Sequence, residues 1–124
     1  MGTFRYRIEL SATPDGPFEA LEALVDTGAT YTFVPSSLLE RLGVRSIDSE
    51  TFVIADGSRI ERRVGEALIR LDGRTRTTMV IFGDEGSSPL LGAFTLEAFS
   101  LSVDTRNRRL VRVPGYLTGV RHDP

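Results

Sequence analysis

The sequence predicts a mainly β domain with two short helices. Short runs of alternating, β-branched or aromatic residues recur along the 124-residue chain and are separated by Gly, Pro, Asp and Ser, the pattern of strands joined by turns. Only residues 36–43 and 93–99 have helical character. The length and the 40% hydrophobic content fit one globular domain. We assign the domain to residues 1–113 and expect a loose, polar tail over residues 114–124.

The expected strands follow from local patterns. Residues 4–10 alternate apolar and polar side chains, as a half-buried strand does. Asp-Gly pairs at 56–57 and 72–73 stand between strand-like runs and predict hairpin turns. The first of these hairpins has a charged outer arm and should project into solvent. In chain order, the expected strands are residues 4–10, 18–25, 31–34, 49–55, 59–64, 65–71, 75–82, 101–104 and 109–113.

The two helices suggest an internal repeat. In the first, Ser37 and Glu40 have the spacing of a capping box, and Gly43 suits the position just after a helix end. Residues 39–44 and 96–101 share the pattern Leu-Glu-x-apolar-x-apolar. In each half the helix follows a strand and a loop, and we match the loop at Asp26 with the loop at Leu91-Gly92. This similarity predicts two related halves.

The composition excludes several classes of function. There is no cysteine, which rules out disulfides, thiol catalysis and zinc–thiolate sites. The net charge of -2 offers no attraction for nucleic acid or an anionic membrane surface. The apolar runs are too short to span a bilayer, and the N-terminus lacks a signal peptide, so we expect a soluble cytoplasmic protein. The single histidine, His122, lies in the tail, and we expect neither a metal site nor a cofactor.

The sequence is organised around residues 24–29, which read LVDTGA. Asp26 stands at the end of an apolar strand, where a carboxylate is partly desolvated unless other groups compensate. The hydroxyl of Thr27 and backbone N–H groups exposed by Gly28 could supply that compensation. The alternative is a plain surface turn, since Asp and Gly are common turn residues. The apolar residues before Asp26 and Ala29 after the glycine favour a functional acid over a plain turn.

These residues resemble the active-site motif of retropepsin-type aspartic proteases, which carry one such motif per chain. Pro89-Leu90-Leu91-Gly92 resembles the apolar-apolar-Gly motif of the same family, and the similarity extends from about residue 18 to residue 111. The resemblance implies a closed-barrel acid-protease fold with a flap hairpin and internal pseudo-symmetry. It also implies that Leu90, Leu91 and Gly92 pack against the Asp26 loop and support the active site.

The resemblance further implies catalysis by two carboxylates that share one proton. This chain has a single Asp-Thr-Gly; Asp104-Thr105 is followed by Arg106 where glycine is needed, so we interpret Asp104 as a strand-end residue. The second carboxylate would therefore come from the Asp26 of another copy in a twofold homodimer. Thr27 would then brace the two loops across the dimer axis, and Gly28 would leave its backbone open to the carboxylate.

The expected flap lies about thirty residues after Asp26. Ala29 and the hairpin tip, Ala55-Asp56-Gly57-Ser58, would bind a peptide substrate. This tip departs from the glycine- and isoleucine-rich flaps of retroviral enzymes because it carries a charge, and an ordinary exposed hairpin is the other interpretation.

The sequence therefore predicts an aspartic endopeptidase that acts as a homodimer on a peptide or protein. A non-catalytic peptide-binding or dimerisation module on the same fold is the alternative. A monomer that becomes active only with a partner, or within a larger chain, fits the same residues.

Overall fold

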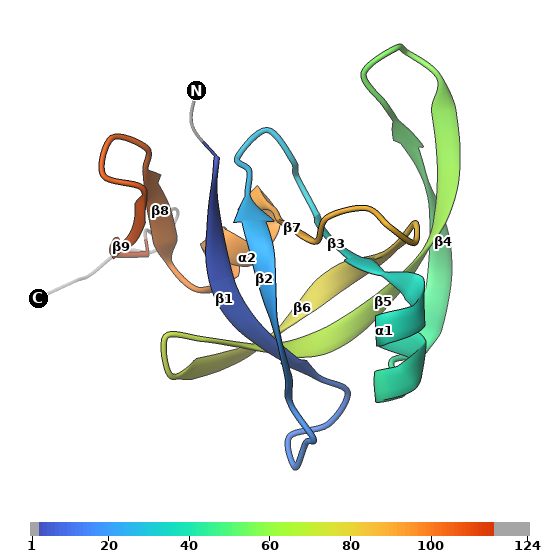
Figure 1. Ribbon diagram of the computed structural model, residues 1–124, viewed down its shortest axis with the longest axis horizontal. Helices are drawn as coiled ribbons and strands as arrows, with labels where there is room; N and C mark the ends of the chain where they lie inside the picture. The colour runs from blue at the N-terminus through green and yellow to red at the C-terminus, as the bar shows by residue number, and fades with distance from the viewer. Residues whose placement is uncertain (1–2, 116–124) are drawn as a thin grey trace, which may run out of the picture.

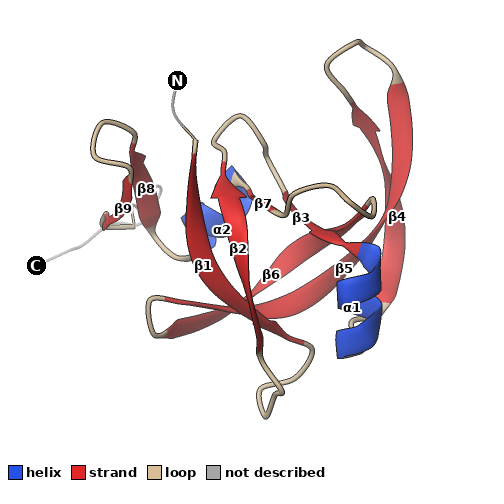
Figure 2. Cartoon of the chain, in the orientation of Figure 1, coloured by secondary structure: helices blue, strands red, loops and turns tan. Residues whose placement is uncertain are grey.

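A computed structural model describes residues 3–115, which form nine strands and two helices (Figures 1 and 2). The mainly β architecture with two short helices is thus confirmed. The elements are β1 (Phe4–Ser11), β2 (Glu19–Val25), β3 (Thr32–Pro35), α1 (Ser36–Leu42), β4 (Ser46–Val53), β5 (Arg59–Leu71), β6 (Arg74–Gly83), β7 (Leu90–Leu91), α2 (Ala93–Ala98), β8 (Leu101–Asp104) and β9 (Arg109–Arg112).

The main sheet closes on itself. Its strand order is β1-β2-β7-β3-β6-β5-β4, and β1 also pairs with β5 through residues 9–11 and 68–70. All strands of this sheet except β4 therefore belong to a closed ring of pairings, which is the expected barrel. Inside lies an apolar core in which the side chains of Ile8, Leu10, Ile69, Val80 and Leu91 are at most 1% exposed. Burying these side chains provides the main driving force for folding.

The strand pairings repeat with a pseudo-twofold relation. Val25 pairs in parallel with Leu91, and Val34 pairs in parallel with Phe82. Exchanging the two halves converts one pair into the other, because Val25 and Phe82 are separated by the same number of residues as Val34 and Leu91. Phe33 pairs with Leu90, its own equivalent, so this pair lies at the pseudo-axis. The two related halves are β1-β2-β3-α1 and β5-β6-β7-α2.

One detail of the expected repeat is wrong. The helix patterns match as expected, but the Asp26 loop does not correspond to the loop at Leu91-Gly92. With the same separation, Leu91 corresponds to Val34 and Asp26 corresponds to Gly83. The reason is that a whole strand, β3, lies between the Asp26 loop and α1, and β7 is its counterpart in the second half.

The two strands expected at 59–64 and 65–71 form a single strand, β5. Gly65 does not interrupt the strand: a Cβ atom there would lie 2.6 Å from the carbonyl oxygen of Arg45 and 3.1 Å from the ring of Phe82. A glycine inside a strand can mark the close approach of another backbone, and here the approaching backbone is the one that leads into β4. The expected strand at 49–55 begins earlier and ends earlier, as β4.

The expected capping box of α1 is also wrong. Pro35 occupies the N-cap position, and it makes no side-chain capping hydrogen bond. Ser37 binds the carboxylate of Glu85 through its backbone N–H (2.8 Å) and hydroxyl (2.6 Å), which holds the pKa of Glu85 below its usual range. Glu40 pairs instead with Arg63 of β5. Gly43 adopts the expected left-handed conformation after the helix, with φ of 87°.

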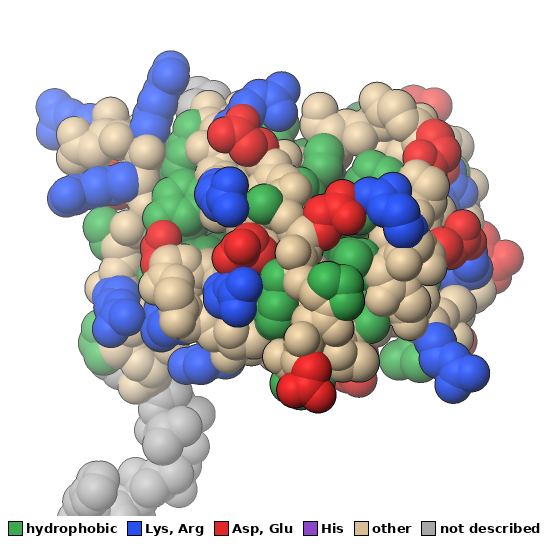
Figure 3. Space-filling view, turned by 60° about the horizontal axis from the view of Figure 1, so that its bottom comes forward, with side chains coloured by type: hydrophobic (Ala, Val, Ile, Leu, Met, Phe, Trp, Pro, Cys, Tyr) green, Lys and Arg blue, Asp and Glu red, His purple; other side chains and the backbone are tan. Residues whose placement is uncertain are grey.

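The remaining features concern the surface and the end of the chain. Strands β8 and β9 form a separate two-stranded sheet, as expected for a terminal hairpin. Acidic and arginine side chains are interspersed over the face in Figure 3. In the described part of the chain, no helix is long and apolar enough to cross a membrane. Most of the expected tail, residues 116–124, lies outside the described residues.

Candidate active site

Asp26 follows directly on β2, at the start of the loop to β3 (Figure 1). Strand β2 lies between β1 and β7. At its end, the N–H of Leu24 donates to the carbonyl of Pro89 (2.8 Å), and the N–H of Asp26 donates to the carbonyl of Leu91 (3.2 Å). The backbone of Asp26 is therefore bonded directly to the second motif.

The side chain of Asp26 is half-buried and accepts a local hydrogen bond. Its Oδ1 atom accepts the N–H of Gly28 at 2.9 Å, and its carbonyl accepts the N–H of Ala29 at 3.0 Å. A Cβ atom on Gly28 would lie only 3.1 Å from Oδ1, so glycine leaves the carboxylate room. Thr27 is exposed, and among the hydrogen bonds of residues 3–115 its hydroxyl has none to Asp26. The compensation in this structure comes from the glycine amide.

The second motif lies in contact with this loop. The N–H groups of Ala93 and Phe94, at the start of α2, donate to the carbonyls of Ala29 (2.9 Å) and Thr30 (2.8 Å). Gly92 is buried, and a Cβ atom there would lie 2.4 Å from the carbonyl oxygen of Tyr31. Only a glycine can let the two backbones approach so closely.

Sequence reasoning missed a buried group of hydroxyls beneath the loop. The N–H of Gly92 donates to Oγ1 of Thr32 (3.1 Å), which lies 2.6 Å from Oγ1 of Thr95. Thr78 of β6 reaches the same Thr95 oxygen at 3.4 Å. All three threonines are buried. Thr78 and Thr32 occur within runs of strand-forming residues, so their type alone gave no signal of a polar role.

The expected flap is the hairpin of β4 and β5, which extends beyond the barrel in Figure 1. The N–H of Ile54 donates to the carbonyl of Ser58, and Gly57 has a φ of 87°. Asp56 accepts hydrogen bonds from the hydroxyl (2.6 Å) and the N–H (2.8 Å) of Ser58, and these bonds lower the pKa of Asp56. Ala55 and its neighbours at the tip are exposed.

A cleft of about 330 Å³ separates the Asp26 loop from the base of this hairpin. Aromatic rings form part of its wall: Phe52 of β4 packs edge-on against Tyr31 (5.7 Å between centroids) and against Phe33 (5.6 Å). The cleft is lined by Gly28, Ala29, Thr30, Tyr31, Phe33, Thr51, Phe52 and Val53. It therefore includes two of the residues selected from the sequence, Gly28 and Ala29, but not the hairpin tip.

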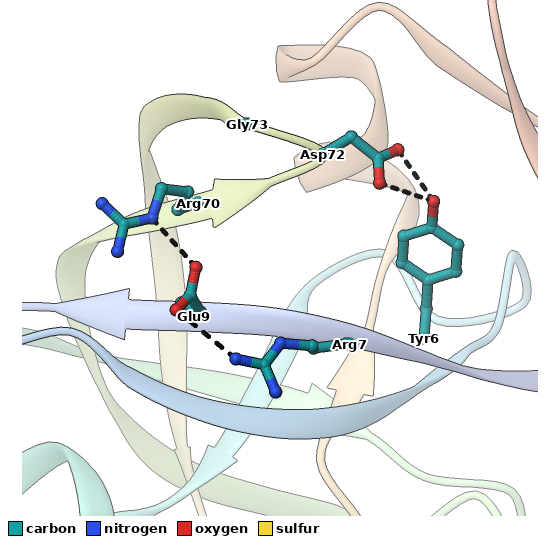
Figure 4. A pocket seen from close by; sticks show the side chains of 6 residues that line it. All are labelled: Tyr6, Arg7, Glu9, Arg70, Asp72 and Gly73. Atoms are coloured by element: carbon teal, nitrogen blue, oxygen red, sulfur yellow. Dashed lines mark hydrogen bonds and ion pairs between the residues drawn. The ribbon is translucent and has the colours of Figure 1, made fainter.

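A second pocket, of about 390 Å³, lies between β1 and the β5–β6 turn (Figure 4). Its polar groups are paired with one another. The hydroxyl of Tyr6 donates to the carboxylate of Asp72, and Glu9 accepts from Arg70. Burial, reinforced by Asp72, raises the pKa of Tyr6 to about 12. None of the lining residues belongs to the Asp26 loop or to the tip of the β4–β5 hairpin.

Asp104 ends β8, as expected for a strand-end residue. Its carboxylate accepts hydrogen bonds from the side-chain N–H of Asn107 (2.8 Å) and from the Nε–H of Arg109 (3.2 Å). These bonds, above all those from Asn107, lower the pKa of Asp104. In the part of the chain that the structure describes, no cluster of three or more His, Cys, Asp or Glu residues could hold a metal ion.

Comparison with known proteins identifies the fold. The simian foamy virus protease is 23% identical, with a TM-score of 0.55, covering 76% of this chain and 92% of the viral one. The EIAV protease, solved with an inhibitor, is 19% identical with a TM-score of 0.65, covering 79% and 88%. A retropepsin-like aspartic protease from Rickettsia conorii is 19% identical with a TM-score of 0.52, covering 83% and 88%. The retropepsin-like fold is thereby confirmed.

No curated protein sequence matches the chain significantly. The aspartyl protease family matches residues 10–94, which is more than half of the chain and includes the Asp26 loop, the flap hairpin and the Leu91-Gly92 segment. The chain therefore belongs to the aspartyl protease family, and its fold is retropepsin-like.

Proposed function

We propose that this protein is an aspartic endopeptidase that acts as a homodimer, in which each copy contributes Asp26. The observation that carries the proposal is the bonding of Asp26 itself. Its carboxylate accepts the Gly28 amide, and its backbone is tied to Leu91. A half-exposed acid held in this way, in a loop whose residues Gly28 and Ala29 line a cleft, is suited to chemistry on a bound peptide.

The chemistry requires a second carboxylate. When two carboxylates lie close together, like charge separates their pKa values, so one is ionised while the other keeps its proton; aspartic proteases are the standard example. The ionised member takes a proton from water, and the neutral member polarises the scissile carbonyl. The pair titrates as a unit.

The second half of the chain does not supply that carboxylate. The pseudo-twofold relation places Gly83 at the position that corresponds to Asp26. The next residue, Asp84, is exposed and pairs with Arg62 at 2.9 Å. A second copy of the chain, related by a twofold axis, would bring an identical Asp26 to the site, with Thr27 bracing the two loops.

The flap hairpin would cover a bound substrate. Its tip, Ala55-Asp56-Gly57-Ser58, would pair with the peptide backbone and exclude water, while the cleft at Ala29 would hold a substrate side chain. Leu90, Leu91 and Gly92 would support the site from below. The contacts of Phe52 with Tyr31 and Phe33 support this role, because they connect the base of the hairpin to the loop and the strand that follow Asp26.

The test is cleavage of a mixed peptide library from acidic to neutral pH, at several protein concentrations. We expect activity per molecule to rise as dimers form, and Asp26→Asn to lower it by at least about a thousandfold. Asp104→Asn is the matched control, since Asp104 is also a strand-end acid but bonds only within its hairpin; it should keep its activity.

Activity that survives in Asp26→Asn would refute the proposal. A wild-type dimer that binds peptides without cleaving them would favour the alternative, a peptide-binding or dimerisation module. Cleavage that appears only when another protein is added would indicate a partner-dependent enzyme.

A further inference from the structure

We propose that the buried hydroxyls of Thr32, Thr95 and Thr78 form a positioning network that sets the geometry of the Asp26 loop. The inference rests on the proposed function, because it assigns these threonines a part in aligning the catalytic acid. None of them would touch substrate. They would act through the backbone of Gly92.

Burying these hydroxyls removes them from water, and the free-energy cost of this desolvation is not offset by packing alone. Four polar side chains of the described residues are buried, namely those of Ser11, Thr32, Thr78 and Thr95. Ser11 bonds to the nearby Thr13 within its own turn. The three threonines come from β3, β6 and α2, and the hydroxyls of Thr32 and Thr78 both meet that of Thr95 in the buried interior. Valine has nearly the same shape as threonine and carries no polar atom, so packing alone would favour valine at these positions.

The hydrogen bonds of the network can run in a single direction. The Gly92 N–H donates to Thr32, and the Thr32, Thr95 and Thr78 oxygens follow at 2.6 and 3.4 Å. Each hydroxyl can accept one bond and donate the next, so the chain of bonds extends from Gly92 to Thr78. Hydrogen bonds linked in this way polarise and strengthen one another, and they hold each hydroxyl in one orientation.

Gly92 connects the network to the Asp26 loop. Two segments, residues 24–31 and 89–94, are joined by backbone hydrogen bonds from Leu24, Asp26, Ala93 and Phe94. The N–H of Gly92, in the second segment, donates instead to a side chain, that of Thr32. This bond holds the glycine at the point where an added Cβ atom would collide with the carbonyl of Tyr31. A shift of Gly92 would therefore be passed to the loop that carries Asp26.

The first experiment needs no enzymatic activity. Amide hydrogen exchange is measured for the full chain with Thr95→Val, which removes the hydroxyl, and Thr95→Ser, which keeps it. Thr95→Val should speed exchange at Gly92 and Gly28 about tenfold relative to amides of β5, which serve as the internal reference. Thr95→Ser, and the control Ser11→Ala, should leave that ratio within about twofold of the wild type.

The second experiment measures cleavage by the same variants. Thr95→Val should lower kcat about tenfold with KM nearly unchanged, because misaligned carboxylates stabilise the transition state less well. The two limbs of its pH profile should move closer together, since carboxylates that lie further apart separate each other's pKa values less. Thr95→Ser should behave as the wild type.

The two proposals fail in different ways. If the wild type shows no cleavage that depends on Asp26, the proposed function fails, and the exchange measurement still decides the role of the network. The positioning role would be overturned if amide exchange at Gly92 and Gly28 rose equally in Thr95→Val and Thr95→Ser. It would also be overturned if exchange in Thr95→Val rose as much at the amides of β5, because the threonines would then contribute only to stability. The positioning role is likewise overturned if Thr95→Val lowers stability but keeps the wild-type kcat and pH profile.

Discussion

Replacing Gly92 by alanine tests the packing beneath the Asp26 loop most directly. The added Cβ atom would lie 2.4 Å from the carbonyl oxygen of Tyr31, 2.5 Å from its carbonyl carbon and 2.9 Å from the carbonyl oxygen of Thr30. All three are backbone atoms, so no side chain can rotate away. To restore ordinary contact distances, the two segments must separate by about 1 Å.

The size of the effect follows from what that separation disrupts. A shift of about 1 Å would weaken the bonds from Gly92 to Thr32 (3.1 Å) and from Asp26 to Leu91 (3.2 Å). Overpacking costs about 1–3 kcal/mol, and each lost hydrogen bond costs about 1 kcal/mol. We expect Gly92→Ala to lower the free energy of unfolding by about 3–5 kcal/mol, a large part of the stability of a small domain.

The assay is equilibrium unfolding in urea. The free energies of unfolding are compared only if the wild type and the variant have the same dependence of free energy on urea concentration. Gly86→Ala is the matched control: Gly86 has a φ of 83° and nothing within 4 Å of an added Cβ. Its substitution carries only the cost of a left-handed alanine, about 1 kcal/mol. If Gly92→Ala is no more destabilising than Gly86→Ala, the close approach at Tyr31 does not constrain the fold.

Two further predictions concern titration. The hydrogen bonds from Ser58 stabilise the ionised form of Asp56, so their contribution to stability is present above the ordinary aspartate pKa and is lost as the pH falls through the lowered pKa. Ser58→Ala should therefore raise the pKa of Asp56, which the NMR chemical shift of the carboxyl group measures. An unchanged pKa in Ser58→Ala would show that these hydrogen bonds do not stabilise the carboxylate. Tyr6, with its pKa raised from 10.0 to about 12, stabilises the fold fully below pH 10 and progressively less as the pH rises through about 12. Asp72→Asn should lower the pKa of Tyr6 only part of the way, because burial is the larger cause; ultraviolet absorbance titration that showed an ordinary tyrosine would contradict this.

Much of the candidate site could be predicted from local sequence. The apolar run before Asp26, the glycine two residues later and the Asp-Gly at 56–57 each require particular backbone conformations or environments. The structure has Asp26 at a strand end and an exposed hairpin turn at Gly57, with a φ of 87°.

The errors arose where a distant partner outweighed a local preference. Ser37 and Glu40 have capping-box spacing, but each bonds to a residue far away in the chain, Glu85 and Arg63. Residues 59–64 and 65–71 have the pattern of two strands, but Gly65 lies inside a single strand, β5, where the backbone at Arg45 approaches it closely. In both cases the local pattern was compatible with two outcomes, and long-range packing selected one.

Composition and short-range pattern are enough to specify a cysteine-free, mainly β fold with one acid in an Asp-Thr-Gly setting, because these properties can be read from the composition or from short stretches of residues. Long-range packing set the closure of β1 on β5, the correspondence of Asp26 with Gly83, the aromatic cleft and the threonine network. Thr32 and Thr95 meet only because β3 and α2 pack together, although 63 positions separate the two residues in the chain. Contacts between residues so far apart depend on how the whole chain folds, and no short stretch of sequence specifies them.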